Sequence, residues 1–164
     1  MNRFSRLSPL LLLAAVAACG SNSPETAQPG EAATAAAPET KPGLALTGGR
    51  LVLPAVSGNP GAAYFTLANG SAKPVTIAAV DVAGAGMVML HETKQVGGHS
   101  EMGALADPTA GPGETLAFAP GGKHVMVMDL PAGLKPGGTV ELTLTFADGD
   151  KLSAPLTIES PGGQ

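Results

Sequence analysis

Residues 139–159 read TVELTLTFA-DGD-KLSAPLTIE, and this stretch decides the fold class. Apolar side chains occupy every second position of its first half: Val140, Leu142, Leu144 and Phe146. A period of two indicates a β-strand with one buried and one solvated face. Asp148-Gly149-Asp150 is a favourable turn between the two apolar segments. The stretch therefore predicts an antiparallel β-hairpin that packs one face against a core.

Similar short apolar segments, separated by Gly- and Pro-containing turns, begin at about residue 45. They are residues 50–56, 62–68, 74–82, 86–93, 100–105, 115–119 and 123–130. The chain also has 23 glycines and 15 prolines among 164 residues, which suits many turns. Eight or nine short strands at roughly regular spacing favour an all-β Greek-key sandwich or barrel. We place this domain at residues 45–160, with residues 161–164 as a tail.

The N-terminal residues 1–18 have the order of an export signal. Arg3 and Arg6 precede a short apolar segment, and small residues precede Cys19. The apolar segment is too short to span a bilayer core of ~30 Å. The segment resembles the bacterial lipoprotein signal, whose cysteine becomes the lipidated first residue after cleavage. The resemblance predicts lipidation of Cys19; an ordinary signal peptide cleaved near Ala18 is the alternative.

Residues 19–44 connect this signal to the domain. Residues 20–43 are rich in Ala, Pro, Glu, Thr and Ser and contain no Val, Ile, Leu or aromatic residue. Such a segment buries too little apolar surface to offset chain entropy, so we expect a flexible tether. With Gly20 and Ser21 after the cysteine, the lipoprotein resemblance implies a periplasm-facing anchor in the cell envelope, in the outer rather than the inner membrane.

The overall charge and the motifs exclude several functions. Without Arg3 and Arg6 the chain has 7 basic and 13 acidic residues, a net charge of −6. An acidic domain lacks the electrostatic footprint of a nucleic-acid-binding protein. No hydrolase, phosphate-loop or Cys–His pattern occurs in residues 45–160. We therefore expect a binding protein rather than an enzyme.

Methionine and histidine are confined to one part of the chain. Apart from Met1, every methionine and every histidine lies within residues 87–128: Met87, Met89, His91, His99, Met102, His124, Met126 and Met128. In a strand, residues two positions apart face the same way. The segments MVMLH at 87–91 and HVMVM at 124–128 therefore each predict one face of His and Met and an opposite aliphatic face.

The ligand types indicate which metal would bind. Thioether sulfur is a good ligand for Cu(I) and a poor one for zinc, calcium or magnesium. A blue-copper electron-transfer site needs a cysteine thiolate, and the only cysteine is Cys19. A Cu(I) carrier without redox function fits the remaining ligands.

The spacing of four of these residues resembles the periplasmic copper chaperones of the PCuAC family. Ten residues separate His91 from Met102, twenty-one separate Met102 from His124, and Met126 completes a His-x-Met motif. The resemblance covers about residues 45–160. It implies a cupredoxin-like β-barrel that binds one Cu(I) through these four residues. It also implies delivery to cuproenzyme assembly, chiefly to the dinuclear copper centre of cytochrome c oxidase or to another copper assembly factor. We expect a monomer.

The remaining ligand-type residues leave alternatives open. We expect Met87, Met89 and Met128 to be an apolar shell around the site rather than ligands. His99 is either an exposed loop residue or a ligand of a secondary or Cu(II) site, because imidazole suits the oxidised ion better than thioether does. Two other functions are compatible with the same sequence. The protein could sequester copper without a dedicated acceptor, or it could be a metal-free β-sandwich lipoprotein that uses the His/Met face for interactions.

Overall fold

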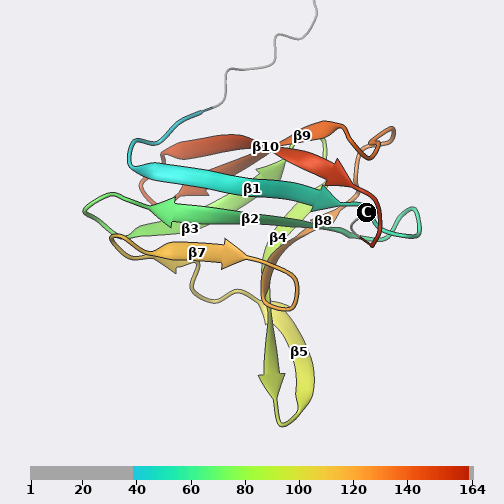
Figure 1. Ribbon diagram of the computed structural model, residues 1–164, viewed down its shortest axis with the longest axis horizontal. Coiled ribbons are helices and arrows are strands. Elements are labelled where there is room, and N and C mark those ends of the chain that lie inside the picture. The colour runs from blue at the N-terminus through green and yellow to red at the C-terminus, as the bar shows by residue number, and fades with distance from the viewer. Residues whose placement is uncertain (1–38, 163–164) are drawn as a thin grey trace, which may run out of the picture. The chain divides into compact units, whose positions relative to one another are not determined.

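The computed structural model describes residues 39–162, which form ten β-strands and no helix (Figure 1). The strands are β1 (Leu44–Val52), β2 (Gly61–Asn69), β3 (Val75–Val82), β4 (Met87–Val96), β5 (His99–Ala104), β6 (Thr109–Ala110), β7 (Thr115–Phe118), β8 (Lys123–Met128), β9 (Thr139–Phe146) and β10 (Lys151–Glu159). The predicted all-β class is confirmed. Within this part of the chain, no helix is long and apolar enough to cross a membrane.

Strands that are distant in sequence are neighbours in the sheet, whose order is β5-β4-β8-β2-β1-β10-β9-β3-β6. β4 pairs with β8 and β3 with β9, both antiparallel, whereas β1 and β10 run parallel. β2 pairs with β8 near its start and with β7 near its end. The crossovers bring the two His/Met segments, β4 and β8, side by side.

The inward faces of the strands form one hydrophobic core. The alternation in β9 is reproduced: Val140, Leu142, Leu144 and Phe146 are all buried. The rings of Phe65 and Phe118 stack at a centroid distance of 4.4 Å across β2 and β7. Among the described residues, the buried core contains aliphatic and phenylalanine side chains and no methionine. Methionine is therefore not used here as a gap-filling core residue.

The first strand differs from the sequence prediction. We expected a strand over residues 50–56, but β1 spans Leu44–Val52 and ends before Pro54. The pairing of β1 with β2 shifts register between Thr47 and Arg50, and Gly48 has a φ of 63°. Gly48 and Gly49 form a bulge that lets one long strand follow β2. Glycine adopts this backbone geometry at little cost. Sequence alternation is lost at such a bulge, which explains the error.

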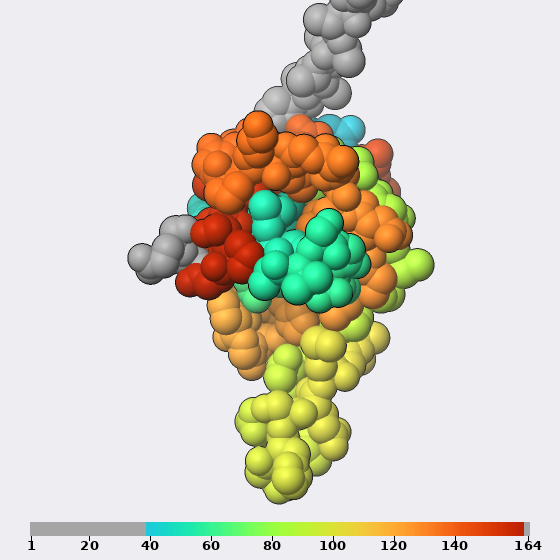
Figure 2. Space-filling model, turned by 90° about the vertical axis from the view of Figure 1, so that its right-hand side faces the viewer, coloured from blue at the N-terminus to red at the C-terminus, as the bar shows by residue number. Residues whose placement is uncertain are grey.

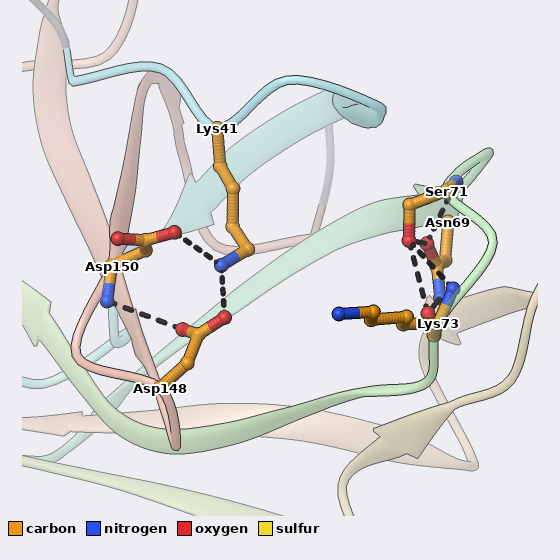
Figure 3. Close-up of polar contacts among 6 residues, drawn as sticks. All are labelled: Lys41, Asn69, Ser71, Lys73, Asp148 and Asp150. Atoms are coloured by element: carbon orange, nitrogen blue, oxygen red, sulfur yellow. Dashed lines mark hydrogen bonds and ion pairs between the residues drawn. The ribbon is translucent and has the colours of Figure 1, made fainter.

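The chain is already fixed to the barrel before β1 begins. The ammonium of Lys41 forms ion pairs with Asp148 and, at 2.6 Å, with Asp150 in the β9–β10 turn (Figure 3). The same ammonium lies 5.3 Å from the centroid of the Phe146 ring. The amide of Ser153 donates a hydrogen bond to the carbonyl of Glu39 at 2.8 Å. The end of the predicted tether therefore contacts the β9–β10 hairpin.

A second polar cluster in Figure 3 closes the far end of β2. The side chain of Asn69 is 1% exposed, and its amide nitrogen donates to the carbonyls of Lys73, Ala110 and Gly111 at 2.8–3.0 Å. Its oxygen accepts from the amide and hydroxyl of Ser71. A fully satisfied buried amide of this kind holds loops together, so we assign Asn69 a structural role.

Candidate metal centre

Three cross-strand pairs of ligand-type residues lie in register on β4 and β8. His91 is opposite His124, Met89 is opposite Met126, and Met87 is opposite Met128. Directly opposed residues in an antiparallel pair have their side chains on the same face. We call this set of six side chains the His/Met ladder. The sequence predicted the two strand faces separately, and the structure joins them into one.

The ladder lies on the outer face of the sheet. Val125 and Val127, which alternate with His124, Met126 and Met128 on β8, are 0% exposed and belong to the core. Val88 and Leu90 on β4 also pack against the core. His91, His124 and Met126 are half-buried on the opposite side. The alternation predicted for both segments is therefore confirmed.

The two histidine rings are close enough to share one ion. Their centroids are 5.9 Å apart and the ring planes are tilted by 58°. Nδ1 of His124 lies 3.0 Å from the carbonyl oxygen of Gly122. A carbonyl can only accept, so Nδ1 carries a proton, and in the neutral ring Nε2 is the nitrogen with a free lone pair. A backbone carbonyl that fixes the tautomer in this way is typical of metal-ligating histidines.

The second imidazole has an unused ring nitrogen. Nδ1 of His91 is buried and has no hydrogen-bond partner within residues 39–162. Buried polar atoms without partners are uncommon, because the lost hydration costs about 1–3 kcal/mol. A ligated metal ion is one way to satisfy such a nitrogen. The donor set on this face, two imidazoles and several thioethers, suits Cu(I).

Met102 is on β5, on the other side of β4 from β8. It is directly opposite Thr93 and therefore diagonal to His91, which is itself opposite Ala104. Diagonal neighbours on one sheet face are ~7–8 Å apart at their α-carbons, within reach of a long side chain. The Met102 side chain is 55% exposed. The topology thus brings all four predicted ligands to one face, on three adjacent strands.

The other ligand-type residues divide by strand parity. Met87, Met89 and Met128 lie on the same face as the four predicted ligands. His99 is opposite Val96 and three residues from Met102. Because three is an odd number, His99 lies on the other face of the β4–β5 hairpin from Met102. His99 is therefore separated from the His91–His124 pair. Sequence reasoning left its position open, because the register of the hairpin determines it.

Charged side chains are confined to the other face of this region. Glu92 lies 3.0 Å from the ammonium of Lys94 and 3.3 Å from that of Lys123. The hydrogen bond from Lys94, followed by that from Lys123, lowers the pKa of Glu92. On β4, β5 and β8 the positions that share the face of the ladder hold only His, Met, Thr, Gln, Ser and Ala. Hard carboxylate ligands are thereby kept away from the histidine pair. Within residues 39–162, no group of three or more His, Cys, Asp or Glu could hold a metal ion.

The fold and its relatives define the class of this protein as a cupredoxin-like all-β domain. It is similar to the Cu(I)-bound solution structure of DR1885 from Deinococcus radiodurans, with 31% identity and a TM-score of 0.60 over 75% of this chain and 82% of that chain. It is also similar in fold to the copper-bound PCuAC domain from PmoF2, with 20% identity and a TM-score of 0.58 over 73% and 94% of the two chains. The predicted cupredoxin-like fold is confirmed.

The sequence identifies the family within this class. The chain belongs to the LpqE-like family, described as "Putative lipoprotein LpqE-like", which matches residues 44–158. It is 34% identical over 95 residues to "Putative lipoprotein Lxx21020" of Leifsonia xyli subsp. xyli, strain CTCB07. That match covers 57% of this chain and 57% of the relative's length.

Proposed function

We propose that this protein is a lipid-anchored, periplasm-facing carrier of Cu(I), with copper as its cargo. His91, Met102, His124 and Met126 would bind one ion. The observation that carries the proposal is the His91–His124 pair, with one Nδ1 hydrogen-bonded to a carbonyl and the other buried without a partner. The likeness to Cu(I)-bound DR1885 supports the same cargo.

The proposed site suits a carrier better than a resident redox centre. Thioether and neutral imidazole ligands stabilise Cu(I), and the thioethers need not lose a proton to bind. The ligands lie on an open sheet face, and Met102 is more than half exposed. An acceptor can therefore approach the ion and replace the ligands one at a time. We expect binding and release, with no catalytic step by this chain.

Copper affinity in matched histidine variants tests the site. The full chain, in detergent and with Cys19→Ser to remove its thiol, is titrated with Cu(I) against a chelator. His91→Ala and His124→Ala should each lower affinity by more than about tenfold, since even outer-shell changes have effects of 10–100-fold. The control is His99→Ala, on the other face, which should bind like the parent. If all three variants bind Cu(I) as tightly as the parent, the His91–His124 site is excluded.

Delivery and anchoring need experiments in the bacterium that carries the gene. The family description as a lipoprotein and the position of Cys19 support a lipid anchor. Labelled fatty acid should enter the native chain and fail to enter Cys19→Ser. If the protein supplies cytochrome c oxidase, its deletion should lower oxidase activity under copper limitation. If it only sequesters copper, deletion should raise copper sensitivity while oxidase activity stays unchanged.

A further inference from the structure

The methionine part of the His/Met ladder contains more thioethers than the proposed four-ligand site uses. Met89–Met126 and Met87–Met128 are two successive cross-strand pairs, following directly on the His91–His124 pair. Successive pairs on one face are ~6.8 Å apart along the strands, two residues at ~3.4 Å each. Only Met126 belongs to the four-ligand set. The sequence predicted only an apolar shell for Met87, Met89 and Met128.

These three methionines are poorly explained as core packing. Met87 is 52% exposed, and Met89 and Met128 are half-buried on the outer face. The described core contains no methionine, and the valines between the ladder positions already fill the inward face. All five methionines of residues 39–162 lie on this one outer face. A flexible apolar side chain has little packing to gain there.

The backbone holds the outermost pair in place. The amide of Gly86 donates to the carbonyls of Met128 and Asp129, both at 3.2 Å. Residue 86 approaches β8 so closely that an added Cβ would lie 2.7 Å from the Cβ of Asp129. The pairing of β4 with β8 is therefore closed at this end as well. Opposed side chains have Cβ atoms about 4.5–5.5 Å apart, and three rotatable bonds let methionine sulfurs converge from there.

We propose that Met87, Met89 and Met128 form a second soft-metal site, made of thioethers alone, which takes Cu(I). Met126 lies between this site and the His91–His124 pair and can serve either. An ion can then pass along the ladder by exchanging one thioether at a time. Copper stays Cu(I) and the ligands stay neutral, so the transfer needs neither a redox partner nor a proton. The exposed Met87 end gives the ion a point of entry or exit.

This second site can be tested independently of the proposed histidine site. The full chain with Cys19→Ser is labelled with ¹³C-methyl methionine and titrated with Ag(I), a soft ion that does not change oxidation state. We expect two Ag(I) per chain and shifts of the Met87, Met89 and Met128 methyl signals. Met87→Leu/Met128→Leu, which preserves side-chain size, should bind one Ag(I), with an unchanged melting temperature as the check on folding.

A second background separates the two proposals. In His91→Ala/His124→Ala/Met102→Leu the histidine site is removed, and one Ag(I) should still bind and shift the methyls of Met87 and Met128. Adding Met87→Leu/Met128→Leu should weaken that binding by about tenfold or more. The proposal is overturned if the Met87 and Met128 methyls stay unshifted at two equivalents of Ag(I). It is also overturned if the triple variant binds no Ag(I). If His91→Ala and His124→Ala bind like the parent chain, the histidine site alone is refuted.

Discussion

The β9–β10 and β4–β5 hairpins have the same topology and opposite burial. In β9–β10 the inward side chains are buried, among them Leu142 and Leu144 at 0% exposure. In β4–β5 no side chain is fully buried, and every residue of β5 is exposed. Figures 1 and 2 show the β4–β5 hairpin, in yellow-green, extending beyond the rest of the barrel. One hairpin stabilises the fold, and the other carries candidate ligands on an exposed pair of strands.

The largest effect on stability is expected in β9. Leu144→Ala leaves a cavity in a close-packed core, which typically costs about 2–5 kcal/mol. The corresponding change in the other hairpin is Val96→Ala, at a side chain that is 50% exposed. Surface changes of that kind are usually within about 0.5 kcal/mol. Urea unfolding of both variants measures the difference, and equal losses would mean that β4–β5 also supports the core.

The two hairpins also differ in how far the sequence predicted them. Alternation in β9 and in the His/Met segments follows from strand geometry, so the buried and outer faces were correct. The pairing of His91 with His124 could not be read from the sequence, because it depends on a crossover that places β8 beside β4. The position of Met89 opposite Met126 depends on the same register. Lys41 was assigned to the tether from local composition, which does not reveal its contacts with Asp148 and Asp150.

The next effect, on copper binding rather than on stability, is expected at Met102. Met102→Leu keeps the volume of the side chain but removes the sulfur, and the residue is 55% exposed. We expect Cu(I) affinity to fall about tenfold, which corresponds to ~1.4 kcal/mol. The unfolding midpoint should stay the same. Chelator competition and thermal unfolding on one preparation measure both. Unchanged affinity would remove Met102 from the proposed site.

A smaller effect is expected at the tip of the β4–β5 hairpin. Gly98 has a φ of 84°, a left-handed conformation in which a side chain costs about 1–2 kcal/mol. Gly98→Ala should therefore loosen the hairpin and speed amide exchange in β5, with a modest loss of copper affinity through Met102. The control is Gly103→Ala, within β5 itself, where an added Cβ meets no atom within 4 Å. Equal exchange in both variants would show that the turn does not hold Met102 in place.

The smallest effect is expected where Lys41 contacts the β9–β10 turn, far in sequence from the proposed ligands. The side chain of Lys41 is 10% exposed, whereas those of Asp148 and Asp150 are 57% and 66% exposed. The hydrogen bonds with Asp148 and then Asp150 raise the pKa of Lys41 above its usual 10.5. The hydrogen bond from Lys41 lowers the pKa of Asp148 below its usual 3.8. An ion pair whose carboxylates are exposed contributes little at any pH, because water and salt screen it.

The direction of these two pKa shifts fixes the pH range of that contribution. Asp148, with its lowered pKa, stabilises the fold above pH 3.8 and loses this effect as the pH falls through its folded-state value. Lys41, with its raised pKa, stabilises the fold below pH 10.5 and loses this effect as the pH rises through its folded-state pKa. Lys41→Met should therefore lower the melting temperature slightly between these values and leave it unchanged at lower pH, with copper affinity the same throughout. Lys151→Met, at an exposed lysine of the same hairpin, is the control. A pH-independent difference between the two variants would mean that Lys41 acts through its packing against Phe146 rather than through its charge.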